Sequence, residues 1–147
     1  MSEARTGDWE LQVDGPGFGF SCMRLVTTPR LRLCAESYSL RARLTSPGPS
    51  GLQEAGLRAC AALANKILVP RGVGVEADGH LRVRQEELSL LLPSQDCLEV
   101  PYGSVTSESL AALVSEELEQ GLPRDACLEV TLTDSKGQET ALRRQLA

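Results

Sequence analysis

The side chains best able to carry out chemistry are few and widely separated in this chain. It has one histidine, His80, and five cysteines that form no C-x-x-C pair. Cys34 and Glu36 are two positions apart, so on an extended strand they share a face and could both approach a metal ion. Two protein ligands make a weak site, because zinc sites use three or four. As a nucleophile, Cys34 lacks a nearby histidine and has only Arg24 or Arg32 to activate it.

Two other features resemble functional motifs but are better explained as turns. His80 follows Asp78-Gly79, a pair that supplies the positive φ angles of a type I′ hairpin turn, so we expect this histidine to be exposed. Gly15 and Gly17 lie between two stretches of alternating polarity, 9–13 and 18–22, and Gly19 lies within the second. A phosphate-binding loop needs a strand on one side and a helix on the other. We therefore expect a hairpin with its turn at 14–17.

The elements expected to position these residues are short strands and two helices. Alternating apolar and polar residues predict a half-buried strand over 38–45, and the Ala- and Leu-rich segment 52–66 predicts a first helix. A second helix is expected to begin after Thr106 or Ser107, with its apolar stripe running to Leu118. The remaining expected strands form a hairpin within 73–83, extended segments at 88–92 and 97–100, and a final pair at 127–132 and 140–142.

Length and composition limit the classes of protein to consider. With 147 residues, of which 41% are hydrophobic, the chain can form one ordinary core, so we expect a single domain over 1–147. A net charge of −5 and few aromatic residues argue against a nucleic-acid partner. No apolar run is long enough to span a membrane and the start has no hydrophobic leader, so we expect a cytoplasmic protein with reduced thiols. The cysteines other than Cys34 are expected to fill the core.

The element order predicts an α+β fold with an antiparallel four-stranded sheet and two helices on one face. At the residue level the chain resembles the family of 6-pyruvoyl-tetrahydropterin synthase and 6-carboxy-tetrahydropterin synthase over nearly its whole length. The resemblance implies the tunnelling fold, in which subunits join their sheets into a closed barrel with the helices outside. It is carried by four stretches, Leu63–Pro70, Val75–Val83, Leu98–Pro101 and Val105–Ala111, and by Leu92-Pro93.

The positions that correspond to the family's zinc ligands carry other residues here. The family binds zinc through three histidines, one after a Phe-Ser-x-x strand and two in a His-x-His-x-Tyr strand. The resemblance puts Arg24 at the first position and Cys34 and Glu36 at the other two, with Tyr38 anchoring the alignment. A protonated guanidinium cannot donate a lone pair to zinc. We therefore expect no zinc cofactor and an Arg24–Glu36 ion pair in the metal's place, with an altered metal site as the alternative.

The positions that correspond to the family's proton-transfer groups are also replaced. The resemblance places Ala64 and Asn65 where an aspartate–histidine dyad stands, and segment 25–33 lacks the family's cysteine. Asparagine has no useful pKa for general-base catalysis. The resemblance aligns the glutamate that binds the pterin ring in the family with Leu132. If the alignment is shifted by two residues, the corresponding residue is Asp134.

A possible pocket remains at the start of the second helix. Thr106, Ser107 and Glu108 match a family motif that lies beside the substrate. The same three residues also suit a simple helix cap, because Thr106 can accept an amide hydrogen bond and Glu108 favours the first turn. The sequence alone leaves both interpretations open.

These residues favour a non-catalytic tetrahydropterin-synthase-like protein, acting as an oligomeric binding or structural subunit. One alternative is a zinc-independent or altered-metal lyase that acts on a pterin-like substrate through Cys34, Glu36 and Arg24. Another is an interaction module that pairs with an active paralogue. We expect a homo-oligomer built from trimeric or tetrameric rings, because an isolated sheet would leave long edge strands unpaired.

Overall fold

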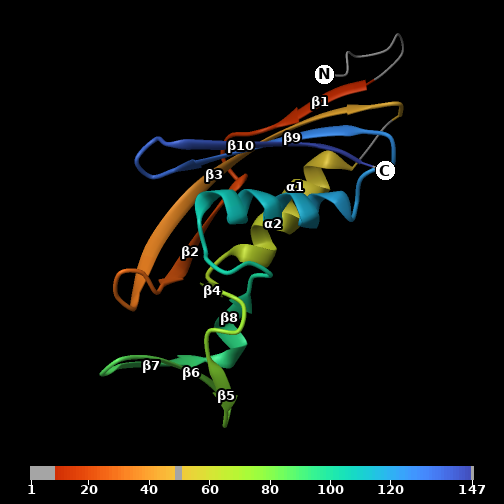
Figure 1. Cartoon of the computed structure of the whole chain (residues 1–147). Helices are drawn as coiled ribbons and strands as arrows, with labels where there is room; N and C mark the ends of the chain where they lie inside the picture. Colours follow the sequence, from red (N-terminus) through yellow and green to blue (C-terminus); the bar gives the residue numbers. More distant parts are fainter. Residues whose placement is uncertain (1–8, 49–50, 147) are drawn as a thin grey trace.

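The structure is a computed structural model that describes residues 9–48 and 51–146. These residues form an α+β fold in which two helices cover one side of a large sheet, with a small sheet projecting beyond it (Figure 1). Pro49 and Ser50, in the turn expected after the first long strand, lie outside the described residues. The elements are β1 (Trp9–Val13), β2 (Gly19–Val26), β3 (Arg32–Ser46), α1 (Leu52–Leu63), β4 (Ile67–Val69), β5 (Val75–Ala77), β6 (His80–Gln85), β7 (Leu88–Pro93), a 3-10 turn (Ser94–Asp96), β8 (Cys97–Glu99), α2 (Ser107–Glu119), β9 (Cys127–Asp134) and β10 (Glu139–Gln145).

The long strand β3 organises the main sheet, in which neighbouring strands run in the order β10-β9-β3-β2-β4-β8. Its 15 residues alternate as expected, so that Tyr38, Leu40, Ala42 and Leu44 are buried. Side chains of a strand point alternately to the two faces, so these four lie on one side, where the helices cover them. The predicted half-buried strand is confirmed.

The predicted hairpin between segments 9–13 and 18–22 is wrong. β1 and β2 both pair antiparallel with β3, one after the other along the same side, with Val13 opposite Ala42 and Gly19 opposite Ser39. The carbonyl of Phe18 accepts a hydrogen bond of 2.9 Å from the Leu40 amide, which continues the ladder between them. β3 is long enough to pair with both segments. The glycine-rich loop therefore separates two strands that follow each other along the same edge of β3.

The expected four-stranded antiparallel sheet is only part of the sheet that forms. β2, β3, β9 and β10 make the antiparallel part, while β4 pairs parallel with β2 and β8 pairs parallel with β4. With β1, the sheet has seven strands. β4 and β8 have three residues each, too few to show a strand periodicity.

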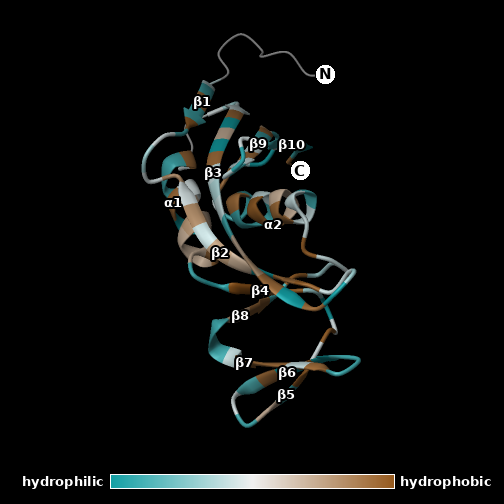
Figure 2. Ribbon diagram, turned by 90° about the vertical axis from the view of Figure 1, so that its left-hand side faces the viewer, coloured by the Kyte–Doolittle hydropathy of each residue, from teal (hydrophilic) through white to brown (hydrophobic). Residues whose placement is uncertain are grey.

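The two helices pack side by side against the buried face of the main sheet. Their apolar residues, shown in brown in Figure 2, join the large core formed with β2, β3 and β9. α1 ends at Leu63, three residues before the expected Lys66. Ala64 is extended and Asn65 has a φ of 60°, and the Asn65 amide donates a 2.7 Å hydrogen bond to the Ser21 carbonyl. Hydrogen bonding to the sheet therefore replaces the last helical turn.

The small sheet has the order β5-β6-β7 and projects from the end of the main sheet (Figure 1). Its first turn confirms the expected hairpin, since Asp78 and Gly79 both have positive φ, of 54° and 77°. Val83 and Leu92 bury their side chains against Leu25, Leu31 and Val69 of the main body, forming a second core. This core fixes the small sheet beside the loop that joins β2 to β3.

Gln85, the last residue of β6, links the small sheet to the β2–β3 loop by hydrogen bonds. Its carboxamide oxygen accepts from the Leu31 amide at 2.6 Å, and its nitrogen donates to the Thr27 carbonyl. The loop that carries Thr27 and Thr28 is therefore held from the small-sheet side. Neither described helix is long and apolar enough to cross a membrane.

Candidate functional site

Two neighbouring strands bring four chemically active side chains to one face. Cys22 stands opposite Glu36 and Arg24 stands opposite Cys34 in the antiparallel register of β2 and β3. Positions 22 and 24, and positions 34 and 36, are each two apart, so all four side chains project from the side that the helices cover. The structure thus brings together Arg24, Cys34 and Glu36, as the sequence predicted.

Arg24 and Glu36 form the expected ion pair at the centre of this group. The Arg24 Nη2 atom lies 3.0 Å from Glu36 Oε1, with each side chain about one-fifth exposed. Arg24 Nη1 donates a second hydrogen bond, of 3.0 Å, to the carbonyl oxygen of Val105. The buried Nε atom of Arg24 has no hydrogen-bond partner among the described residues. The guanidinium therefore ties the two strands to the segment that leads into α2.

The start of α2 closes the group on its other side. Tyr38, the next residue along the same face of β3, is buried, and the side chain of Ser107 at the start of α2 lies near its hydroxyl. Burial is the largest effect on this phenol and raises the pKa of Tyr38. Its ring lies 5.5 Å from that of Phe20, measured between ring centres. Tyr38 therefore belongs to the core that α2 forms with the strands.

Thr106 acts as the cap of α2. Its Oγ1 accepts a 3.1 Å hydrogen bond from the Ser109 amide, and Ser109 Oγ accepts one of 2.8 Å from the Thr106 amide. This reciprocal arrangement is a capping box. Glu108 is exposed in the first turn. The helix-cap interpretation of Thr106 is confirmed.

The ion pair lies between two cavities. Arg24 and Thr106 border one of about 330 Å³, walled by the β2–β3 loop at Thr27 and Thr28 and by Arg32. Glu36 borders another of about 610 Å³. The remaining residues around this larger cavity come from several elements: Ser21, Cys22, Met23, Ala35, Ser37, Asn65, Ile67, Asp96 and Ser135.

The two predicted base positions lie apart from the first cavity. Ala64 packs against the main core, and Asn65 borders the larger cavity, close to the hydroxyl pair of Ser21 and Ser37, whose oxygens are 2.8 Å apart. Asn65 is held in the left-handed region at the end of α1, with its amide bound to the sheet. Its position is explained by the chain reversal between α1 and β4.

The other candidate residues have structural surroundings. Leu132 is buried opposite Leu40, where a carboxylate would be desolvated. Asp134 Oδ1 accepts hydrogen bonds from the amides of Lys136 and Gln138, at 2.9 and 3.0 Å, and so caps its own turn. His80 is exposed, with Nδ1 3.1 Å from the Asp78 carbonyl oxygen.

The sequence did not lead us to expect Cys22 beside the candidate site. Burial is the main cause that raises the pKa of the Cys22 thiol to about 11, with Glu36 raising it further and Arg24 opposing. The signal was available, because residue 22 precedes Arg24 by two positions on the same strand. At neutral pH this thiol is protonated, so it is a poor metal ligand and a poor nucleophile.

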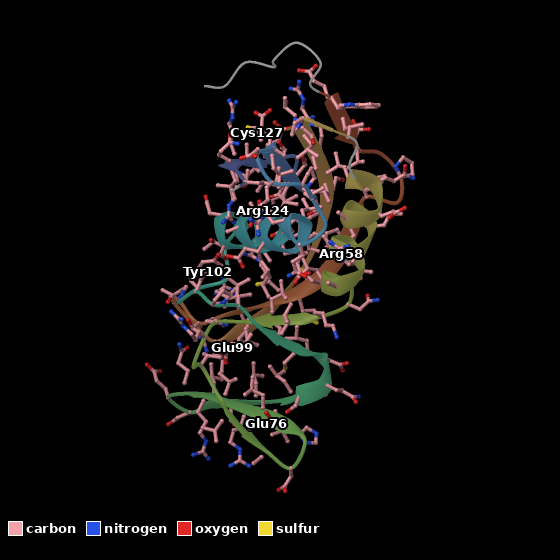
Figure 3. All side chains as sticks on the ribbon, turned by 90° about the vertical axis from the view of Figure 1, so that its right-hand side faces the viewer. Arg58, Glu76, Glu99, Tyr102, Arg124 and Cys127 are labelled. Atoms are coloured by element: carbon pink, nitrogen blue, oxygen red, sulfur yellow. The ribbon has the colours of Figure 1, made fainter. Side chains whose placement is uncertain are left out.

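All five cysteines are unpaired. Cys22 and Cys60 are buried in the main core, and Cys97 is half-buried against the second core, as expected of core-filling cysteines. The expectation is wrong for Cys127, which is half-buried at the start of β9 and belongs to neither core. Cys127 accepts a hydrogen bond of 3.2 Å from Arg143 Nε at the end of the molecule far from the small sheet and Glu76 (Figure 3). Among the described residues, no three His, Cys, Asp or Glu side chains are grouped so as to hold a metal ion.

Comparisons with known proteins establish the fold. No family model and no curated protein matches the sequence. Among solved structures, 6-pyruvoyl tetrahydropterin synthase from Plasmodium falciparum matches with a TM-score of 0.79 and 14% identity. A Plasmodium vivax 6-pyruvoyltetrahydropterin synthase variant, in which a catalytic glutamate is replaced by alanine, matches with a TM-score of 0.74 and 19% identity. Each match covers 95% of this chain and 99% of the other. The chain has the fold of these synthases.

Proposed function

We propose that the protein is a non-catalytic member of the tetrahydropterin-synthase-like fold, which acts as an oligomeric binding or structural subunit. The observation that carries this proposal is the ion pair between Arg24 and Glu36. This pair lies where the sequence resemblance would place a zinc ion. One of the three positions assigned to zinc ligands is Arg24, whose protonated guanidinium cannot bind a cation.

The donor set around this position does not suit zinc. Zinc prefers three or four ligands drawn from thiolate, imidazole and carboxylate groups. Here the candidates are Cys22, whose pKa is raised by burial, Cys34, and a Glu36 carboxylate that already binds Arg24. A cation placed among them would face the positive guanidinium of Arg24 at close range, which costs Coulomb energy in a partly buried site. No zinc-dependent step is therefore assigned to this chain.

The groups that would move protons support the same proposal. Asn65 cannot act as a base at neutral pH, and Ala64 has no titratable group. The position assigned to the pterin-binding glutamate holds Leu132, which is packed inside the core. The replacement of the metal ligand, the base and the ring-binding carboxylate together supports a non-catalytic role for this fold.

An oligomeric ring remains the assembly that we propose. Among the described residues β10 pairs only with β9, so it presents one unpaired edge over seven residues, Glu139–Gln145. Unpaired edges of this length are usually covered or paired in folded proteins. Closing the sheets of several copies into a ring would pair these edges. An active paralogue could take the place of an identical subunit in the same ring.

A rebuilt lyase is the second candidate. It is favoured by the cavity of about 330 Å³ beside Arg24, which is of the size that accepts a small molecule, with the half-buried Cys34 on the same face. In this alternative Arg24 would bind an anionic group of a pterin-like substrate, and Cys34 or Glu36 would transfer the proton.

A turnover assay separates the two candidates. Purified protein is incubated with dihydroneopterin triphosphate, with and without added zinc, beside an active 6-pyruvoyl-tetrahydropterin synthase as the positive control. The proposal predicts product at the level of a heat-denatured sample under both conditions. Turnover above that level, abolished by Cys34→Ala or by Glu36→Gln, would establish the rebuilt lyase instead.

A further inference from the structure

The outer face of the small sheet combines exposed apolar side chains with unpaired positive charge. Among the described residues, five large hydrophobic side chains are exposed, and two of them, Val75 and Leu91, lie on this face. A third, Leu88, belongs to the same sheet but stands opposite Gln85, on the face of Val83. Val75 is the most exposed, at 71%. Concentration of apolar surface on one small element is typical of an interaction site.

Two arginines lie between the apolar residues of this face. Arg82 stands opposite Val75 on one side and Leu91 on the other, and Arg84 follows two residues later on the same face of β6. Both are exposed, and neither forms an ion pair with a carboxylate in the described ranges. By contrast, the comparable pair on β3, Arg41 and Arg43, has Glu139 within 3.9 Å of Arg41.

A groove runs between these arginines and the chain that enters β5. Its volume is about 440 Å³, and its walls are formed by segment 72–75, Ala77, Arg82 and Arg84. Gly74 is required at this wall, because a Cβ atom there would come within 2.8 Å of the Arg82 carbonyl oxygen. Segment 72–75 therefore lies directly against β6, and the groove is bounded by backbone on one side and guanidinium groups on the other.

β5 is also an open edge. Within the part of the chain that the structure describes it pairs only with β6, and all three of its residues are exposed, so its outward edge can pair with another strand. Glu76 projects to the opposite face, where its charge acts on Cys97, and so leaves the groove face positive. In Figure 3 Glu76 marks this sheet at the end of the molecule.

We propose that this face binds an extended acidic segment of a partner protein, which adds a strand to β5. Main-chain hydrogen bonds to β5 would provide affinity, while alternate side chains would place carboxylates on Arg82 and Arg84 and an apolar group in the groove. A symmetric contact with the same face of a second copy is disfavoured, because it would bring four arginines together. Charge complementarity therefore favours a different, acidic partner.

The test uses the full chain labelled with ¹⁵N and a short synthetic peptide that alternates glutamate and valine. The proposal predicts amide shifts confined to 72–77 and Arg82–Arg84, with affinity that falls as salt increases. A peptide with lysine in place of glutamate should not bind. The double variant Arg82→Glu, Arg84→Glu should weaken binding of the glutamate peptide at least tenfold and should gain binding of the lysine peptide.

The matched control is the double variant Arg41→Glu, Arg43→Glu, which reverses an equally spaced, exposed pair on β3. It should bind the glutamate peptide as the unchanged protein does. The proposal is overturned if the peptide does not bind, if shifts map to β10, or if the control weakens binding as much as the small-sheet variant. It is also overturned if the unchanged protein self-associates through this face and the Arg82→Glu, Arg84→Glu variant does not.

Discussion

Arg24 holds Glu36 across the β2–β3 ladder with 3.0 Å between Nη2 and Oε1, and the two side chains border different cavities. The same guanidinium reaches the Val105 carbonyl, one residue before the cap of α2. The pair thus connects the two strands, the helix start and both cavities. The pair is therefore expected to stabilise the fold and to exclude a metal ion from this position, and the two effects are measured separately.

Breaking the ion pair from one side should destabilise the fold. Arg24→Gln leaves the Glu36 carboxylate, about one-fifth exposed, without its charged partner, and leaves the Val105 carbonyl without its donor. We expect the free energy of unfolding to fall by roughly 1–3 kcal/mol. Urea denaturation followed by circular dichroism measures it.

The control for this experiment is a double-mutant cycle with Glu36→Gln. If the two charges stabilise each other, the double variant should lose less than the sum of the two single losses. Strictly additive losses would show that Arg24 and Glu36 act independently and would contradict the structural role given to the pair.

The capping box of α2 gives a second stability prediction. Thr106→Ala removes the oxygen that accepts from the Ser109 amide, and should cost about 1 kcal/mol. Ser104→Ala, at an exposed position just before the helix, is the matched control and should change stability by no more than a few tenths of a kcal/mol. Equal effects of the two changes would contradict the cap.

Alkaline pH should destabilise the protein through Cys22. The pKa of this thiol is about 11 in the folded chain against 9.0 when solvated, so burial favours the neutral form. The associated stability is fully present below pH 9 and is lost as the pH rises from 9 to 11, amounting to roughly 2 kcal/mol. Cys60 and Tyr38 also have raised pKa values and add to the loss.

Comparison with Cys22→Ala isolates the contribution of Cys22. The variant should be less stable at pH 7, because it leaves a small cavity, but its stability should decline less steeply above pH 9. Parallel curves for the two proteins in this range would exclude Cys22 as the cause.

The sequence predicted the elements whose signals are local. The alternation around Tyr38 and Leu40, the Asp78-Gly79 turn and the Thr106 cap each depend on residues a few positions apart, and each is present. The failures involve long-range pairing. Segment 9–13 alternates equally well whether it pairs with β2 or with β3, and only the full length of β3 decides between them.

The candidate site shows the same division. Residues two apart on one strand share a face, so the grouping of Cys34 with Glu36 followed from spacing, and the approach of Arg24 followed from the alignment with a known family. The contact of Arg24 with Val105, 81 residues away, had no local signal. The small sheet escaped notice as a separate unit because its second core is completed by Leu25 and Leu31, which are distant in sequence.

The assembly gives a further prediction. Because β10 has no second partner strand among residues 9–48 and 51–146, we expect a ring of three or four copies, or a stack of such rings, at micromolar concentration. Light scattering coupled to size exclusion measures the mass directly. A single species of 15.8 kDa would contradict the ring and the proposal that this protein acts as an oligomeric subunit.

Metal content tests the central claim most directly. Elemental analysis of the purified protein, after incubation with zinc and removal of the excess, should find no stoichiometric zinc, because Arg24 binds Glu36 at the position that the sequence resemblance assigns to the metal. The triple variant Arg24→His, Cys34→His, Glu36→His should gain zinc, which checks that the positions are correctly identified. About one zinc per chain in the unchanged protein, lost in Cys34→Ala, would contradict the account.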